Sequence, residues 1–467
     1  MTSLYSALEK FCNFSRAGFT TIIFIGKYTA VKKDLENKGE DPMGRLAIVG
    51  GVRTAIGGFG GSLKDVPADL LLTICFGEVL KQTGVNPWLI SEVVAGNICQ
   101  PSDSANIARV AALRAGVPNH VPARTVARNC ASGIEAITSA CQAYAAGDGE
   151  IFLVGGTENM SQIPYILKHA RFGQRLQHHV LTDGIWEGLT DPIVNKMMGW
   201  TAENIAQRWN ISRQEQDKFA VNSHQKAFKA KREGKFKSQI APVVIKTNMV
   251  MGEKTMGGEK IFSEDELINP GLNLQTAALQ PAIFMNERIS EPLNPRARLE
   301  NGKVILETVV ANEGTVTPKN SCPMSDGAAA LLLVSESKVI ELGLVPMAYV
   351  VSYAYAGCDP ACMGEGPIYA VPKALAKVGL KTEDIDFFEL NEAFASQSII
   401  CQRSLKITDE KLNIWGGAIA LGHPVGATGA CLTVKAMHIL KENHKRYAAI
   451  TMCVGGGQGG CLIIERT

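Results

Sequence analysis

The chain has 467 residues, of which 46% are hydrophobic and 20% are charged, and its formal net charge is +2. A chain of this length and composition can bury two or more sizeable cores. The near-neutral charge without a long basic run argues against a nucleic-acid-binding protein. The longest apolar stretch near the N-terminus, around residues 21–26, is too short to span a membrane.

Residues 1–42 differ in composition from the rest of the chain, and a clean strand pattern begins at residue 46. We expect this segment to be a leader that can be disordered. The alternative is a mitochondrial targeting peptide, because residues 1–33 contain five bases and one acid, Glu9. The twelve cysteines form no compact framework, which favours a reducing, cytoplasmic location, and no Cys/His spacing indicates a metal site.

Two segments of the chain repeat the same order of elements. The first consists of a β-rich stretch at 124–129, Cys130, a small-residue helix at 131–146 and a strand at 150–154 that stops at two glycines. The second consists of an extended stretch at 412–415, His423, a helix at 426–441 and a strand at 448–452 that stops at Cys453. This repetition predicts a duplicated α/β architecture. Because helices of Ala, Gly and Ser bury little area per residue, we expect the two helices to contact each other or the sheets closely.

The composition and the order of predicted elements divide the chain into four parts. They are a leader at 1–42, a first α/β half at 43–156, a loop domain at 157–312 with an exposed insertion near 286–312, and a second α/β half at 313–467. Within the loop domain we expect helices at 201–209 and 213–233. Ser212 and Glu215 form a capping-box signature at the start of the second helix.

Cys130 follows an extended stretch and begins a predicted helix. Unpaired N–H groups and the helix dipole at such a position favour the thiolate, so we expect the pKa of the Cys130 thiol to be lowered. A lone cysteine at a helix start is more often a core residue, and a single histidine is more often structural. Paired with Cys130, however, His423 becomes the candidate base that activates the thiol.

Cys453 ends a buried strand, and the glycines at 455–457 that follow can point N–H groups into a cavity as oxyanion donors. The Gly-x-Gly-x-x-Gly match at 455–460 does not indicate a dinucleotide site, because a strand and not a helix follows it. Asn391 can hold a water or an acyl oxygen, although Asn and Glu at a helix start are also ordinary capping residues.

Together these stretches closely resemble the thiolase family over roughly residues 45–466. The matching motifs are NCASG at 129–133, GGTENMS at 155–161, MGWTAEN at 198–204, GTVT at 314–317, NEAFA at 391–395, GGAIALGHP at 416–424 and CVGGG at 453–457. The resemblance implies a duplicated five-layer αβαβα fold with an inserted loop domain. It also implies activity on coenzyme A thioesters, which are substrates and not cofactors, in a homodimer or homotetramer.

The resemblance also assigns roles to individual residues. Cys130 is the nucleophile that holds the acyl group, His423 activates it and helps bind the thioester oxygen, and Cys453 moves the proton at the α-carbon. Asn391 holds a water in one oxyanion hole, and the N–H groups of Cys130 and Gly455 form the other. The substrate-binding residues that it implies are Tyr165, Cys322, Met363, Ala393 and Phe394.

Within the family, residues 358–367 and the loop at 160–200 look most like acetyl-CoA acetyltransferases, which make acetoacetyl-CoA from two acetyl-CoA molecules. One alternative is a degradative 3-ketoacyl-CoA thiolase of β-oxidation that acts on longer chains. Another is a non-catalytic acyl-CoA-binding protein, which predicts the loss of Cys130 or Cys453, yet both are present. The related ketoacyl synthases pair their cysteine with two histidines, whereas this chain has Asn391 and Cys453 in those roles.

Four positions depart from the family pattern on the coenzyme side. Asn269 stands where Arg is common, and Pro318, Cys322 and Tyr165 stand where short-chain relatives often carry Ala, Ser and His. These departures bear on the contacts to coenzyme A and leave the catalytic residues unchanged.

Overall fold

The computed structural model describes residues 45–173, 176, 178–251, 254–284, 297–300, 303–306 and 314–466. The described residues from Arg45 onward belong to one compact unit. The predicted leader at 1–42 and most of the predicted insertion near 286–312 lie outside the described residues. None of the helices in the described ranges is long and apolar enough to cross a membrane.

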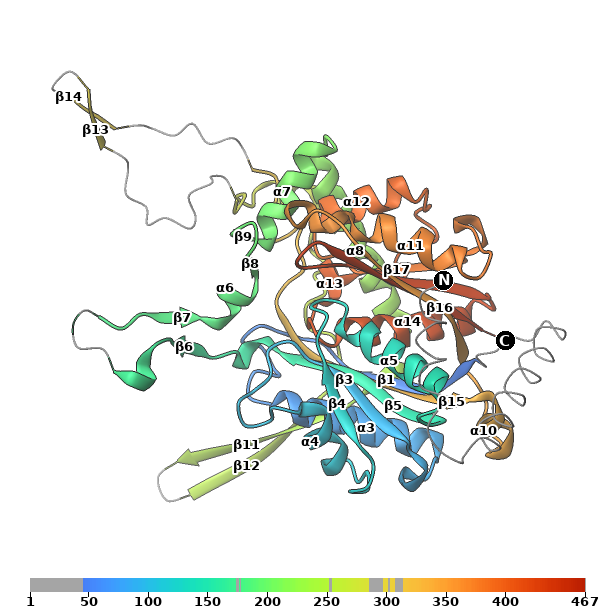
Figure 1. The fold of residues 1–467 in the computed structure, drawn as a ribbon. Helices are drawn as coiled ribbons and strands as arrows, with labels where there is room; N and C mark the ends of the chain where they lie inside the picture. The colour runs from blue at the N-terminus through green and yellow to red at the C-terminus, as the bar shows by residue number, and fades with distance from the viewer. Residues whose placement is uncertain are drawn as a thin grey trace, which may run out of the picture. The chain divides into compact units, whose positions relative to one another are not determined.

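A continuous path of hydrogen-bonded strands links the two halves of the chain (Figure 1). Its order is β17 (Phe387–Leu390), β18 (Tyr447–Val454), β19 (Gln458–Glu465), β16 (Ala348–Gly357), β1 (Leu46–Thr54), β15 (Ser325–Ser335), β5 (Ile151–Asn159), β3 (Glu92–Gly96) and β4 (Ala123–Val126). The pairs β17–β18, β3–β4 and β3–β5 are parallel, and the other pairs along the path are antiparallel. β1 and β16 pair only at Ala47–Tyr349 and Ile48–Ala348, so a short contact joins the two sheet halves.

The sequence of β15 explains its central place in the sheet. Every residue of this strand is buried. Because successive side chains of a strand point to opposite faces, Leu331 and Leu333 enter one core while Leu332 and Val334 enter another. An unbroken apolar run is what a strand covered on both faces requires.

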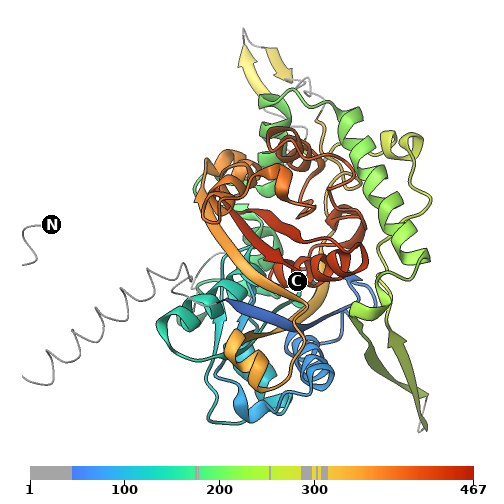
Figure 2. The same cartoon turned by 90° about the vertical axis from the view of Figure 1, so that its right-hand side faces the viewer.

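Helices cover both outer faces of the sheet halves and fill the space between them (Figure 2). α5 (Ser132–Ala146) and α14 (Thr428–Glu442) form the middle layer. α3 (Ala68–Thr83) and α4 (Ile107–Arg114) pack on the N-terminal half, and α11 (Gly366–Ala376) and α12 (Ala395–Ser404) pack on the C-terminal half. This is the layered arrangement that the resemblance implied.

The two middle helices contact each other through glycine. A Cβ atom on Gly133 would lie 2.5 Å from the backbone nitrogen of Ala430, and one on Gly429 would lie 2.4 Å from that of Ile134. The expectation that the small-residue helices touch is therefore confirmed.

Two predicted strand boundaries are wrong. β5 does not stop at its glycines but continues to Asn159, because the strand stays paired with β15, where Gly155 faces Ala330. Residues 412–415 form no strand. Leu412 makes only an isolated bridge to Phe388, and β17 supplies the edge strand instead.

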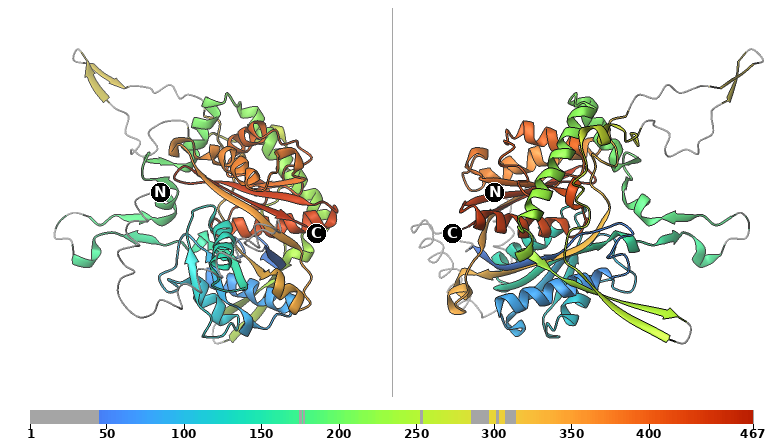
Figure 3. Two further views of the ribbon diagram at one scale, coloured as in Figure 1. Left: turned by 45° about the vertical axis from the view of Figure 1, so that its right-hand side comes forward. Right: turned by 180° about the vertical axis from the view of Figure 1, so that it is seen from behind.

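The remaining described elements belong mainly to the loop domain or to connections. The helices are α6 (Gly184–Gly188), α7 (Met198–Arg208), α8 (Arg213–Arg232), α9 (Leu274–Ala278), α10 (Glu336–Glu341) and α13 (Ala418–Leu421). The strands are β2 (Gly57–Gly58), β6 (Tyr165–Leu167), β7 (Leu181–Asp183), β8 (Thr190–Asp191), β9 (Lys196–Met197), β10 (Ile240–Ala241), β11 (Val243–Met251), β12 (Lys254–Phe262), β13 (Ala297–Glu300) and β14 (Lys303–Leu306). The β6–β7 and β11–β12 hairpins project away from the layered body (Figure 3).

The predicted capping box at the start of α8 is confirmed. The Ser212 hydroxyl accepts from the backbone N–H of Glu215, whose carboxylate accepts from the N–H of Ser212.

Candidate active site

A cavity of about 340 Å³ brings together segments from both halves of the chain and from the loop domain. Cys130 reaches it from the turn before α5, His423 from the turn before α14, and Gly455 from the turn after β18. Apolar loop-domain side chains such as Met160 and Leu189 form much of the remaining wall. The cavity therefore combines a thiol, an imidazole and a glycine turn with a mainly apolar surface.

The Cys130 thiol is held in a protected environment. Burial raises its pKa, and the negative charge of Glu158 adds to this, while hydrogen bonds from the backbone N–H groups of Gly455 and Cys130 itself act in the opposite direction. The prediction of a lowered Cys130 pKa is wrong. α5 begins two residues later, at Ser132, and desolvation outweighs the donors near the helix start.

His423 is held in one tautomer by a neighbour five residues along the chain. Its Nδ1 lies 2.6 Å from the Thr428 hydroxyl oxygen, and that hydroxyl donates to the carbonyl of Pro424 at 2.9 Å. Because a hydroxyl has one proton to give, Thr428 must accept from Nδ1–H. Nε2 then carries the lone pair, and burial lowers the pKa of His423 to about 4. The imidazole is therefore a neutral base at physiological pH.

Asn391 lies beside the lone pair of His423. Its side-chain nitrogen is 3.4 Å from Nε2, and its backbone N–H donates to the carbonyl of Thr451 on β18. Its Oδ1 atom is buried and accepts no hydrogen bond from the described residues. An acceptor in that condition is suited to hold a small polar partner.

Cys453 lies directly behind the cavity wall. It is fully buried near the end of β18 and clusters with Met363 and Ala393, both of which line the cavity. Burial, followed by the influence of the neighbouring Cys130 thiol, raises the pKa of Cys453 well above its ordinary value. The two sulfur atoms predicted to act together thus belong to one site, and both are protonated at rest.

Four of the five predicted substrate-binding residues line the cavity: Cys322, Met363, Ala393 and Phe394. The backbone N–H of Cys322 donates to the carbonyl of Ala393 at 3.0 Å, which places the two segments side by side. Burial, followed by the influence of Cys130, raises the pKa of Cys322 to about 12.

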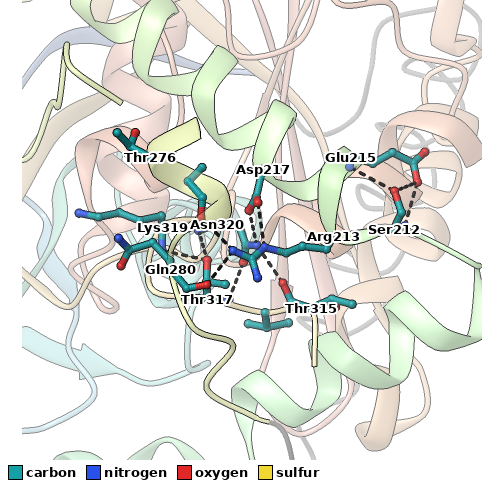
Figure 4. Close-up of polar contacts among 12 residues, drawn as sticks. Ser212, Arg213, Glu215, Asp217, Thr276, Gln280, Thr315, Thr317, Lys319 and Asn320 are labelled. Atoms are coloured by element: carbon teal, nitrogen blue, oxygen red, sulfur yellow. Dashed lines mark hydrogen bonds and ion pairs between the residues drawn. The ribbon is translucent and has the colours of Figure 1, made fainter. Parts of the chain in front are cut away.

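A polar network at the start of α8 fixes the segment that carries Cys322 (Figure 4). The side-chain nitrogen of Asn320 donates to Asp217 at 3.0 Å, and Asp217 is in turn paired with Arg213 at 2.8 Å. Asn320 also accepts from the backbone N–H of Thr317 at 2.8 Å. This network joins the loop domain to the wall of the cavity.

Two predicted positions lie elsewhere. Tyr165 is 66% exposed on β6 and does not line the cavity, because the β6–β7 hairpin carries it away from the body. Asn269 also lies outside the cavity lining, where its N–H donates to His224 and its side chain accepts from Gly271. The geometry of this chain gives neither residue a contact with the candidate site.

Several residues of the site were not singled out from the sequence. Glu158 accepts hydrogen bonds from the backbone N–H groups of Ile98, Cys99 and Gly426, and burial raises its pKa to about 7. It lies within the GGTENMS motif, which was the available signal. The signal for Thr428 was weaker, since it consists only of a hydroxyl side chain five residues after His423. The apolar lining residues had none.

Among the described residues, no group of three or more His, Cys, Asp or Glu side chains is arranged to hold a metal ion. The cavity lining offers three thiols, those of Cys99, Cys130 and Cys322, two carboxylates, one imidazole and backbone N–H groups. This set is suited to nucleophilic and acid–base chemistry.

Comparison with known proteins gives a consistent picture. Residues 46–287 match the family described as "Thiolase, N-terminal domain", and residues 344–466 match "Thiolase, C-terminal domain". A protein of Staphylococcus aureus (strain COL) named "Probable acetyl-CoA acyltransferase" is 39% identical over 426 residues, which are 91% of this chain and 100% of that protein.

Solved structures are similar over the same extent. Human mitochondrial 3-ketoacyl-CoA thiolase superposes with a TM-score of 0.82 at 36% identity, covering 91% of this chain and 100% of that one. The acetyl-CoA acetyltransferase of Bacillus anthracis superposes with a TM-score of 0.81 at 40% identity, covering 91% of this chain and 99% of that one.

Proposed function

Because this chain belongs to the thiolase family and is an acyltransferase of that family, we propose that it catalyses the reversible condensation of two acetyl-CoA molecules to acetoacetyl-CoA and coenzyme A. The observation that carries the proposal is that Cys130 and His423, from opposite halves of the chain, line one cavity, and that Cys453 lies directly behind its wall. We propose that no metal or bound cofactor takes part, since a thiol, a base and fixed donors are sufficient for this chemistry.

In the first step Cys130 attacks the thioester carbon of acetyl-CoA. Its proton passes to Nε2 of His423, which the Thr428 contact keeps free to accept it. The coenzyme A sulfur leaves and takes the proton of the Cys453 thiol. The site then holds acetyl-Cys130, an imidazolium and a Cys453 thiolate, so the charges balance.

In the second step a new acetyl-CoA enters. The Cys453 thiolate removes a proton from its α-carbon, and the resulting carbanion attacks the carbonyl carbon of acetyl-Cys130. The Cys130 sulfur leaves and recovers its proton from His423. Acetoacetyl-CoA is released, and every group returns to its resting protonation state.

Each step develops negative charge on a carbonyl oxygen, which needs fixed donors. One set would comprise the backbone N–H groups of Cys130 and Gly455, both of which lower the pKa of the Cys130 thiol as donors. The other comprises protonated His423 and a water that Oδ1 of Asn391 would hold. Loss of one such donor typically lowers the rate by about 10²–10³.

Mass spectrometry tests the proposal. Incubation with acetyl-CoA should add one acetyl group to Cys130 in the wild type and none in Cys130→Ala. Cys453→Ala should still acetylate Cys130, although more slowly because coenzyme A must then leave as a thiolate, and it should form no acetoacetyl-CoA. A wild type that binds acyl-CoA tightly and never becomes acylated would instead be a binding protein, and condensation at the wild-type rate by Cys453→Ala would exclude the proposed proton path.

The wall of the cavity favours a second candidate, the thiolysis of longer 3-oxoacyl-CoA substrates. Ile163, Ile185 and Leu189 extend the apolar lining beyond the catalytic turn. Each additional buried methylene contributes about 0.8 kcal/mol, so a lengthening series should gain about fourfold in kcat/KM per carbon while the chain fits. A decline beyond four carbons would support the acetoacetyl-CoA reaction.

A further inference from the structure

Asn129, the residue before the nucleophile, has an uncommon backbone conformation. Its φ is +41°, in the left-handed region that side chains other than glycine seldom adopt. Asparagine is among the residues that tolerate this region, but glycine adopts it with less cost. The turn alone therefore does not explain why a side chain is present at position 129.

Hydrogen bonds that do not involve the Asn129 side chain already stabilise this turn. The Ser132 hydroxyl donates to the carbonyl of Asn129 at 2.7 Å and accepts from the backbone N–H of Arg128 at 2.8 Å. Ala131 is the N-cap of α5, and no side chain caps that helix. The Asn129 amide is thus free for another task.

The Asn129 side chain reaches the other half of the chain. Its Nδ2 donates to the carbonyl oxygen of Gly455 at 2.9 Å, across 326 positions of sequence. Gly455 lies two residues after Cys453 and lines the cavity together with Cys130, and its N–H acts as a donor that lowers the pKa of the Cys130 thiol. Asn129, which precedes the nucleophile in the chain, therefore binds the same residue whose N–H acts on the Cys130 sulfur.

Gly455 begins the three-glycine turn that joins β18 to β19, and the far end of this turn is held by another segment, because the N–H of Cys358 donates to the carbonyl of Gly457 at 2.7 Å. Gly456 and Gly457 follow it with φ values of +87° and +78°, and a Cβ on Gly456 would meet nothing within 4 Å. A run of glycines has more backbone freedom than any other sequence. At the near end of the turn, the Asn129 amide supplies a side-chain contact that holds Gly455 from outside the run.

We propose that Asn129 is a positioning residue for the thiolase reaction, whose side-chain amide holds Gly455 so that its N–H stays aimed at the Cys130 sulfur and at the oxyanion formed beside it. This inference rests on the proposed function of the site. It concerns a side chain that acts through Gly455 and not on the substrate itself.

The test variant is Asn129→Gly, which accepts the same φ and removes only the amide. Asn210→Gly is the matched control, because Asn210, like Asn129, is exposed and has a positive φ (+51°), but it lies just after α7 and does not line the cavity. Misplacement of a catalytic donor by about 1 Å can cost about 10²-fold in rate. We therefore expect kcat for thiolysis of acetoacetyl-CoA to fall about 10–100-fold in Asn129→Gly, with KM and the melting temperature near those of the wild type, and no change in Asn210→Gly.

Two further measurements separate positioning from a structural role. Alkylation of Cys130 by iodoacetamide, followed by peptide mass spectrometry, should slow in Asn129→Gly because the thiolate loses a donor; a loosened turn would expose the sulfur and accelerate alkylation. Asn129→Asp keeps the shape and tolerates the φ, yet places a carboxylate against the Gly455 carbonyl, so it should also lose kcat.

The inference is overturned if Asn129→Gly keeps the kcat of the wild type, or if it loses melting temperature and kcat together while alkylation accelerates. Failure of the proposed function is a different result. In that case the wild type itself forms no acyl-Cys130 with any 3-oxoacyl-CoA, whatever residue occupies position 129.

Discussion

The hydrogen bond between Thr428 and His423 offers the sharpest test of the mechanism. Thr428→Val keeps the shape of the side chain and removes the acceptor for Nδ1–H. A buried donor left unpaired costs about 1–3 kcal/mol. The cost should fall mainly on the transition state, because Nδ1–H donates most strongly when His423 becomes cationic. At about 1.36 kcal/mol per tenfold, kcat should decrease between about fivefold and about 160-fold.

Thr433→Val supplies the control. Thr433 lies on the same helix, is buried, and donates to the carbonyl four residues earlier, Gly429, at 2.8 Å, as Thr428 donates to Pro424. Both variants lose that helical bond, so the difference between them isolates the histidine contact. Acetoacetyl-CoA thiolysis, followed by enolate absorbance, gives kcat, and Thr428→Ser should restore it. Equal rates in the two valine variants would refute the assigned tautomer.

Three further predictions concern stability. The pKa of His423 is about 4 in the folded chain and about 6.5 when unfolded, so the unfolded chain gains the proton first as the pH falls. In urea titrations the free energy of unfolding of the wild type, relative to that of His423→Gln, should therefore decrease by up to about 3 kcal/mol between pH 6.5 and pH 4. A difference that does not change with pH would contradict the buried neutral imidazole. Gly426→Ala should lower the free energy of unfolding by about 1–3 kcal/mol, because the added Cβ would lie 2.7 Å from the carbonyl oxygen of Thr157. In the control Gly77→Ala the added Cβ meets nothing within 4 Å, so thermal melting should show no loss of stability or a small gain, and equal effects of the two variants would refute the packing argument. Lys435→Met should lower the free energy of unfolding by about 3–5 kcal/mol, because it leaves Glu389 buried and unpaired. The double variant with Glu389→Gln should recover part of that loss, and a Lys435→Met variant as stable as the wild type would show that the pair carries no charge.

Much of the architecture was accessible from the sequence because it depends on local patterns. The repeated strand, turn and small-residue helix predicted the doubled fold, and the Ser212–Glu215 pair predicted a helix start that the structure confirms. The edge strand β17 was misplaced, because a short apolar run and an extended turn look alike until tertiary pairing selects one.

The candidate site was predictable to the extent that its residues lie in turns that lead into predicted helices. Cys130 and His423 fall in such turns, and the structure brings both to one cavity. The pKa of Cys130 was not predictable, because it depends on how much chain from the other half covers the sulfur. The position of Tyr165 outside the cavity lining was not predictable for a related reason, since whether a strand folds over a cavity or leaves the body is a property of the hairpin as a whole.

The glycine contact between the middle helices constrains how this chain can diverge over evolution. A larger residue at Gly133 or Gly429 could be accepted only if the opposite backbone retreated. That movement would also displace Cys130 and His423, which shortly precede the two helices. Substitutions on one middle helix must therefore be matched by substitutions on the other. A chimera that takes one half from a relative would keep its catalytic activity only if the facing helix came from the same relative.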